Sequence, residues 1–198
     1  MSPWRAAPTL VGRHVTLRPI ERSDQAALVE AAQSGGTDRQ FTTIAPSIAS
    51  GDRWIESAFR DQEWGRAMVF AVLDPAGAVI GATRFLRMNE GDRRVEIGGT
   101  FYAASAQRTG ANTDAKRLLL THAFDVLGCQ CVQLRTDWLN RRSRAAIERL
   151  GAKQDGVLRG HRVMPDGRVR DTVVYSVLTH EWPGVRANLE QLLERHER

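Results

Sequence analysis

The chain has 198 residues, of which 42% are hydrophobic and 26% charged, and its 28 Lys and Arg against 23 Asp and Glu give a net charge of +5. This size and composition predict one folded domain with a sizeable core, and the absence of a long apolar run or signal-like start predicts a cytoplasmic protein with no membrane span. The positive charge suits an anionic ligand, but the basic residues are scattered among acids, so a mixed solvated surface is preferred to nucleic-acid binding.

Alternation of apolar and polar residues between turn-forming residues predicts the elements of the first half of the chain. The apolar run 68–73 indicates a buried strand, which forms a hairpin with the strand that follows it. Gly98 and Gly99 lie inside a later strand, where glycine indicates a bulge or the close approach of another backbone. In chain order we expect a strand over 14–18, a helix over 23–33, an irregular segment over 37–49, a helix from 50 until Gly65, and strands over 68–73, 79–86 and 95–102.

The second half predicts a pair of parallel strands. A helix over 110–127 connects the strands 95–102 and 131–136, and strand, helix and strand at this spacing form a βαβ unit. Asn140 is expected to cap the next helix, which ends before Gly151. A hairpin over 157–163 and 169–178 and a terminal helix over 181–195 complete the domain. The result is an α/β fold with a mixed sheet and helices on both faces, in a single domain over 1–198 with its core over about 10–180.

The stretch from Gln107 to Lys116 carries the strongest functional signal. It opens the expected helix with small residues, and a helix start leaves several backbone N–H groups unpaired at the positive end of the helix dipole. Together with the charge of Arg108, these groups predict a site for a diphosphate. A glycine at a helix start can also be an ordinary turn or cap, and this alternative stays open.

The sequence indicates neither a metal site nor a covalent intermediate. Cys129 and Cys131 are the only cysteines; a disulfide between them would be strained and two sulfurs do not complete a zinc site, so two free thiols are expected. The five histidines show no metal-binding spacing. No G-x-S-x-G motif is present, and no visible base accompanies either cysteine.

Five segments, in order, resemble the GNAT superfamily of acyltransferases, in its ribosomal-protein N-terminal acetyltransferase (RimJ/RimL) branch. The similarity spans about residues 10–185. In the superfamily's phosphate motif, Q/R-x-x-G-x-G/A, Asn112 replaces the last small residue, and Asn tolerates left-handed backbone angles better than most residues; the pattern G-x-N-x-x-A-K is typical of one sub-branch. The five segments are Gly12–Pro19, Val95–Gly98, Gln107–Lys116, Asn140–Ala152 and Arg170–Ser176.

The resemblance implies a mostly antiparallel sheet with one splayed parallel strand pair, and acetyl-CoA as co-substrate. The pantetheine arm would enter between the splayed strands, and the diphosphate would rest on the helix-start amides. For Lys116 and Arg142 a contact with the outer phosphates and a place on a solvated helix face are equally open. The cofactor-binding residues implied are Thr100, Phe101, Tyr102, Gln107, Arg108, Gly110, Ala111, Asn112, Thr113, Lys116, Asn140, Arg142 and Ser143.

Glu96, Ser143 and Asn140 are the expected catalytic residues. Glu96 stands in an apolar strand beside the splay, where partial burial would raise its pKa toward that of a working base; its alternative role is an ion pair with Arg93, Arg94 or Arg135. By resemblance, the Ser143 hydroxyl donates to the CoA sulfur, or else it only supports the helix start. Asn140 caps that helix and bonds the pantetheine or nearby backbone, and a backbone N–H near Thr100 meets the oxyanion.

The function implied is acetyl transfer from acetyl-CoA to a primary amine, by direct attack in a ternary complex. The acceptor is a protein N-terminus or a small molecule, and the basic surface disfavours a polycation. Segments 34–50 and 160–168 are expected to shape its pocket. The alternatives are a CoA-binding module without catalysis and, less favoured, a nucleic-acid-binding protein that uses the helix over 141–149. The terminal helix suggests a homodimer, and the resemblance to the family implies the same.

Overall fold

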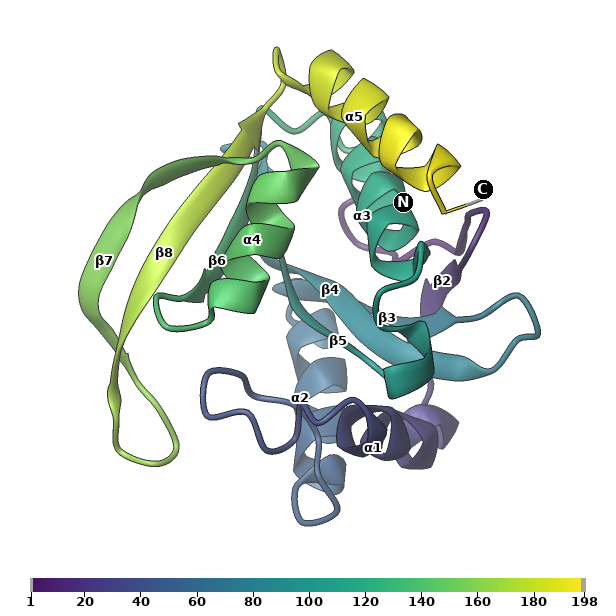
Figure 1. Ribbon diagram of the computed structural model, residues 1–198, viewed down its shortest axis with the longest axis vertical. Helices are drawn as coiled ribbons and strands as arrows, with labels where there is room; N and C mark the ends of the chain where they lie inside the picture. The colour runs from purple at the N-terminus through teal and green to yellow at the C-terminus, as the bar shows by residue number, and fades with distance from the viewer. Residues whose placement is uncertain (1, 197–198) are drawn as a thin grey trace.

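An eight-stranded mixed sheet organises residues 2–196, the part of the chain that the computed structural model describes (Figure 1). Residue 1 and residues 197–198, the ends of the predicted domain, lie outside the described residues. The strand order is β1-β2-β3-β4-β5-β6-β8-β7, and within this sheet only β5 and β6 pair in parallel. The strands are β1 Leu10–Val11, β2 Thr16–Pro19, β3 Ala67–Leu73, β4 Val79–Asn89, β5 Arg94–Tyr102, β6 Cys131–Asp137, β7 Lys153–Val163 and β8 Val169–Leu178.

Helices cover both faces of this sheet, as the sequence predicted (Figure 1). One apolar core lies between the sheet and α1 and α2, and the other lies between the sheet and α3, α4 and α5. The longer helices are α1 Gln25–Ser34, α2 Gly51–Glu63, α3 Ala111–Thr121, α4 Arg141–Leu150 and α5 Trp182–Glu194. Short turns of helix lie at η1 Arg22–Asp24, η2 Ala104–Ala106 and η3 His122–Val126.

One local expectation from the sequence was wrong, and one strand was not expected. The helix expected over 110–127 is an α-helix only to Thr121; η3 follows as a π turn, in which the backbone N–H of Leu127 donates to the carbonyl of His122, five residues back. Strand β1 has two residues, too few for an alternating pattern. Ser50 precedes α2 without capping it, and its hydroxyl accepts from the Ser47 backbone N–H.

A bulge, one of the two alternatives for Gly98 and Gly99, lies in β5 at the point where the two parallel strands separate. β5 and β6 pair from Arg94 to Ile97, opposite Cys131 to Leu134, and no pairing follows. At the end of this pairing, Gly99 adopts a φ of +57°, and the pairing of β5 with β4 shifts register. A residue with a side chain rarely adopts this backbone conformation, so glycine allows the bulge there. The bend lets the far half of β5 diverge from β6.

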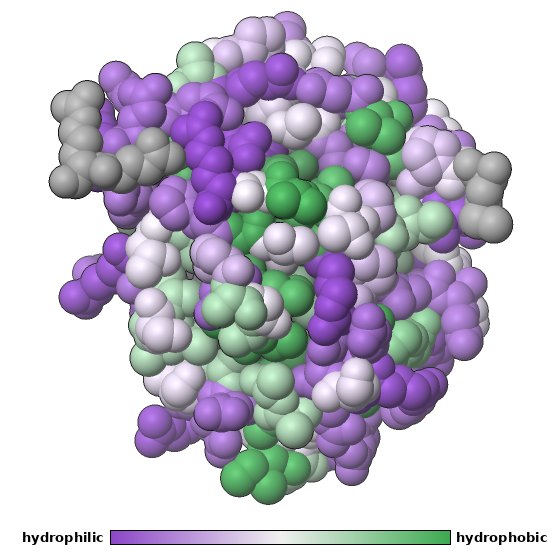
Figure 2. Space-filling model, turned by 90° about the vertical axis from the view of Figure 1, so that its right-hand side faces the viewer, coloured by the Kyte–Doolittle hydropathy of each residue, from purple (hydrophilic) through white to green (hydrophobic). Residues whose placement is uncertain are grey.

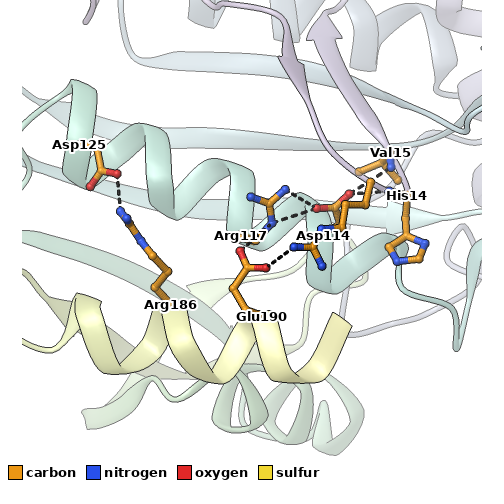
Figure 3. Close-up of polar contacts among 8 residues, drawn as sticks. His14, Val15, Asp114, Arg117, Asp125, Arg186 and Glu190 are labelled. Carbon is orange, nitrogen blue, oxygen red and sulfur yellow. Dashed lines mark hydrogen bonds and ion pairs between the residues drawn. The ribbon is translucent and has the colours of Figure 1, made fainter. Parts of the chain in front are cut away.

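The terminal helix α5 docks on its own chain. Leu189 and Leu193 are fully buried, and α5 packs against α3. Figure 3 shows the polar contacts beside this core: Glu190 faces Arg117 of α3, and Arg186 pairs with Asp125 of η3. The apolar stripe of α5 is therefore used within the chain.

The surface is mixed, as the composition suggested. On the face shown in Figure 2, small groups of apolar residues near the middle are surrounded by hydrophilic side chains. Within residues 2–196, no helix combines the length and the apolar character needed to cross a bilayer.

Candidate active site

A cleft of about 990 Å³ opens where β5 and β6 diverge. Its walls come from the far half of β5, the start of α3, the start of α4, the segment after α1, and the β7–β8 hairpin. Segment 34–50 and the 160–168 turn were expected to shape an acceptor pocket, and residues from both segments, Thr37 and His161 among them, line the cleft. The sheet thus brings together residues that lie more than one hundred positions apart in the chain.

The turn before α3 leaves backbone donors available. Among the described residues, the amides of Gly110, Asn112 and Thr113 have no hydrogen-bond acceptor, whereas Asp114 is the first amide bonded within the helix. Arg108 stands beside them with a positive φ of +64°. These donors at a helix N-terminus fit the diphosphate of a nucleotide-like cofactor.

The backbone of this turn differs from the expectation at two positions. Asn112 lies inside α3 and needs no left-handed angle; the left-handed residue is Arg108. Gly110 has an ordinary helical φ of −66°, and glycine is required for another reason: a Cβ there would lie 2.7 Å from the His14 ring. The predicted Gly12–Pro19 segment therefore belongs to the site as packing for the turn.

Asp114, which the sequence analysis missed, fixes the start of α3 against the beginning of β2. Its carboxylate is fully buried and accepts hydrogen bonds from the backbone N–H groups of His14 and Val15 at 2.7 and 3.3 Å (Figure 3). Arg117, one turn further along α3, donates to the same carboxylate. A contact between positions 14 and 114 has no signal in a single sequence.

Gln107 joins three segments at the rim of the cleft. Its amide Nε2 donates to the carbonyls of Gly35 and Tyr102, and its Oε1 accepts from Arg142 Nη2 at 2.8 Å. The polar atoms of the Gln107 side chain thus have partners within the chain. Arg142 is exposed at the start of α4, where the remainder of its guanidinium faces the cleft.

Lys116 does not lie on a solvated helix face, so that alternative was wrong. Its side chain is 6% exposed, and its Nζ donates to Thr100 Oγ1 at 2.7 Å and to Thr83 Oγ1 at 3.3 Å. Burial lowers the pKa of Lys116 from its ordinary value to about 7. The lysine links α3 to the bulge in β5, and its hydrogen bonds run to these two threonines instead of to the turn.

Glu96 lies on β5 just before the bulge and is 4% exposed. Its Oε2 accepts from Arg87 Nη1 at 2.6 Å and lies 3.3 Å from Arg135 Nε, so the predicted ion pair with Arg135 is present and Arg87 joins it. Among the described residues no donor reaches Oε1, which lies beside Gly98 where the strands separate. A carboxylate held through one oxygen can accept a proton at the other.

Asn140 and Ser143 stand at the opposite wall. Asn140 caps α4 as predicted: its Oδ1 accepts from the Ser143 backbone N–H at 3.0 Å. Both residues line the cleft, and the Ser143 side chain is half-buried. The far half of β5, from Thr100 to Tyr102, has no pairing with β6, and on this stretch the Tyr102 carbonyl accepts from Gln107.

Metal ligands and reactive cysteines would be two further kinds of catalytic group in the described part of the chain. No group of three or more His, Cys, Asp or Glu side chains within residues 2–196 could hold a metal ion. Cys129 and Cys131 are free thiols, as expected. Fold and cleft together fit the class of enzymes that bind a diphosphate-bearing co-substrate between two diverging strands.

Comparisons with known proteins give the family. The model of the acetyltransferase (GNAT) domain matches residues 14–153. YdaF of Bacillus subtilis (strain 168), provisionally named a ribosomal N-acetyltransferase, is 29% identical over 180 residues, which cover 88% of this chain and 96% of YdaF. A GCN5-related N-acetyltransferase from Brucella melitensis superposes with a TM-score of 0.86 at 30% identity, over 96% of this chain and 87% of that one. RimJ of Mycobacterium smegmatis, solved with CoA-disulfide, shares the fold, with a TM-score of 0.81 at 20% identity over 97% of both chains.

The chain belongs to the GNAT acetyltransferase family. It is accordingly an acetyl-CoA-dependent N-acetyltransferase, with an amine as the acceptor class. The resemblance that five short segments suggested is thereby confirmed, together with the mostly antiparallel sheet and its splayed parallel pair.

Proposed function

We propose that this chain acetylates the α-amino group of a protein N-terminus by direct attack on acetyl-CoA in a ternary complex. The observation that carries the proposal is Glu96, whose Oε2 is held by Arg87 and Arg135 while Oε1 faces the point where β5 and β6 part. The provisional name of the Bacillus relative, a ribosomal N-acetyltransferase, supports a protein acceptor and, with it, a cytoplasmic location.

The residues proposed to hold acetyl-CoA lie along one continuous path. The free amides of Gly110, Asn112 and Thr113 would bind the diphosphate, assisted by Arg108 and Arg142, whereas the predicted Ala111 amide already donates to Thr109 Oγ1. The backbone of β5 at Phe101 and Tyr102, which has no pairing with β6, would pair with the pantetheine arm as an added strand does, except at the Tyr102 carbonyl, which Gln107 occupies. Lys116 drops out of the phosphate contacts, because its ammonium is bonded to two threonines, and Gln107 acts through its contact with Arg142.

The chemistry requires a neutral amine, a polarised carbonyl and a proton for the departing thiolate. An α-amino group, with a pKa of about 7.7–8.0, is partly neutral near pH 7, whereas a lysine amine, at about 10.4, is not. We propose that Glu96 Oε1 accepts the amine proton directly or through one water, that the Thr100 backbone N–H stabilises the oxyanion, and that Ser143 donates to the sulfur. Asn140 keeps Ser143 in place by capping α4.

The two alternatives have less support. A CoA-binding module without catalysis would not need a buried carboxylate with one oxygen facing the splay. A nucleic-acid site on α4 is disfavoured because that helix buries Ile147 and Leu150 in the core. Its Arg144 donates to Tyr175, and Arg149 lies against Thr113.

Glu96→Gln tests the mechanism. We expect kcat/KM toward an N-terminal peptide to fall by about 10²- to 10⁴-fold, with little change in acetyl-CoA affinity, because general-base assistance is lost while the side chain keeps its shape. The measurement is thiol release against pH, with product mass to confirm which amine is modified. Glu63→Gln, at an exposed carboxylate outside the cleft, is the matched control. An unchanged rate and an unchanged acidic limb would remove Glu96 from the mechanism.

A further inference from the structure

The cleft wall carries far more positive charge than a CoA diphosphate needs. Among the described residues that line it are nine arginines and Lys116, against only two carboxylates, Glu96 and Asp61. Three of these arginines, Arg108, Arg142 and Arg149, stand near the α3 turn or on α4, on the side proposed for the diphosphate. The others include a group on the sheet itself, on its opposite face.

Strand periodicity places this second group. Side chains alternate between the two faces of a strand, and Phe85, Ile97, Leu134 and Val173 point into the core under α3 and α4. Their neighbours in the strands therefore face the other way, toward the side that α1 and α2 cover only over β3 to β5. That face carries Arg84, Glu96, Arg135, Arg170 and Thr172. It forms the floor of the cleft on the acceptor side.

Two of these guanidinium groups lack acceptors within the chain. Among the described residues, neither Arg84 nor Arg170 donates a hydrogen bond, and the Nε of each is buried without a partner. The nearest carboxylate to Arg170 is Asp137, at 3.9 Å, which is already bonded to Arg168 at 2.6 Å. Buried donors without an acceptor are rare in folded proteins, so an oxygen atom, from water or from a ligand, is expected beside each of them.

The pKa of His161 reflects the positive charge of this floor, and the pKa of Arg84 reflects its burial. His161, at the edge of this floor, has its pKa lowered by burial and then by Arg135, Arg87, Arg170 and Arg162. Burial lowers the pKa of Arg84 to about 10, with only Asp61 acting in the opposite direction. Glu96 already has two arginines on its Oε2. Arg84 stacks on the Trp54 ring, and Arg170 has only the distant Asp137, so neither has a carboxylate within hydrogen-bond distance among the described residues.

We propose that the acceptor is an N-terminal segment with acidic side chains close behind its α-amino group. This proposal rests on the proposed function and adds the substrate class to it. The amine would meet Glu96, and the carboxylates that follow would bind Arg84 and Arg170 on the floor, with Arg162 at the rim. A guanidinium presents paired donors that match a carboxylate, so such contacts supply both charge and geometry. A polycationic acceptor is repelled from the same floor.

The test compares three peptides that share the first residue, Ser, and differ at positions two to four: Glu-Asp-Glu, Gln-Asn-Gln and Lys-Arg-Lys. With the wild-type enzyme, kcat/KM should be about tenfold higher for the acidic than for the neutral peptide, mainly through KM, and lowest for the basic one. In Arg170→Gln and in Arg84→Gln, the acidic-to-neutral ratio should fall several-fold, and Arg170→Lys should restore part of it. Arg53→Gln, at an exposed arginine of α2 outside the cleft, should keep the wild-type ratio.

The neutral peptide distinguishes a failure of the acidic-acceptor proposal from a failure of the proposed N-terminal acetylation. If the neutral and acidic peptides react equally, or if the ratio survives both Arg→Gln changes, the acidic acceptor is wrong and N-terminal acetylation stands. If no peptide reacts although the protein binds acetyl-CoA, both proposals are overturned. Free glutamate and aspartate are included, and acetylation of these alone would overturn a peptide acceptor.

Discussion

At the residue scale, the least expected feature is a lysine buried next to the bulge. Lys116 lies in the first turns of α3, and its Nζ donates to hydroxyls from β4 and β5. It connects the helix that carries the diphosphate turn to the strand that carries Glu96. Because its ammonium is removed from water, the folded state favours the neutral amine, and this is why its pKa falls to about 7.

The lowered pKa of Lys116 makes stability depend on pH in a defined direction. Between about pH 7 and the ordinary lysine value of 10.5, the unfolded chain binds more protons than the folded chain, so this group's contribution to stability rises with pH. Relative to Lys116→Met, the wild-type free energy of unfolding should therefore increase by about 1.4 kcal/mol per pH unit from pH 7.5 to 9.5. Urea unfolding at pH 6, 7.5 and 9 measures it.

The other lysine of the chain supplies the control. Lys153 lies on the exposed strand β7, and Lys153→Met reports the general effect of losing a lysine. If the curves of wild type and Lys116→Met stay parallel across this range, Lys116 is not buried in solution as described.

At the scale of elements, α5 determines how firmly α3 is held. Glu190 of α5 pairs with Arg117, which also donates to Asp114 at the start of α3 (Figure 3). At the start of α5, Trp182 stacks on Phe124 of η3. Helix α5 thus contacts α3 and η3 and holds in place the turn proposed to bind the diphosphate.

Leu189→Ala tests this support. Leu189 is completely buried between α5 and α3, and removal of its side chain should lower the free energy of unfolding by about 2–5 kcal/mol through lost apolar contact and a residual cavity. Gln191→Ala, exposed on the same helix, should change it by no more than about 0.5 kcal/mol. Equal, small effects of the two changes in urea unfolding would show that α5 is not docked.

At the scale of the whole molecule, charge and shape act together. The net charge of +5 is not spread evenly, since the cleft holds nine arginines against two carboxylates among its described lining residues. The predicted homodimer cannot use the apolar stripe of α5, because that stripe is buried within the chain. A homodimer would need another surface, and it remains a prediction. The single domain over 1–198 also remains a prediction.

This distribution of charge predicts a salt effect that depends on the acceptor. Screening shortens from about 10 Å at 0.1 M salt to about 3 Å at 1 M, and it weakens attraction between partly exposed charges. Raising NaCl from 0.05 to 0.5 M should increase KM for the acidic peptide by about threefold or more and leave KM for the neutral peptide nearly constant. Steady-state kinetics at fixed saturating acetyl-CoA measures both; a parallel change would point to a general salt effect on the enzyme.

Local pattern determined the elements, the parallel pair, the bulge at Gly99 and the Asn140 cap. These depend on residues close together in the chain: turn glycines, apolar alternation, and a side chain that reaches an amide three positions ahead. The five matching segments also gave the family, because they preserve the order in which that fold uses them.

Only the tertiary structure decided what surrounds those residues. Four features depend on distant segments that meet only in the folded chain. Lys116 is buried, and Asp114 binds the backbone at residue 14. Arg87 joins Arg135 on Glu96, and Arg84 and Arg170 lie on one face of the sheet. The physical reason is that burial and the local electric field are properties of the assembled sheet. A single sequence names a charged residue, but only the folded chain shows which charges stand opposite it and which of them lack a partner.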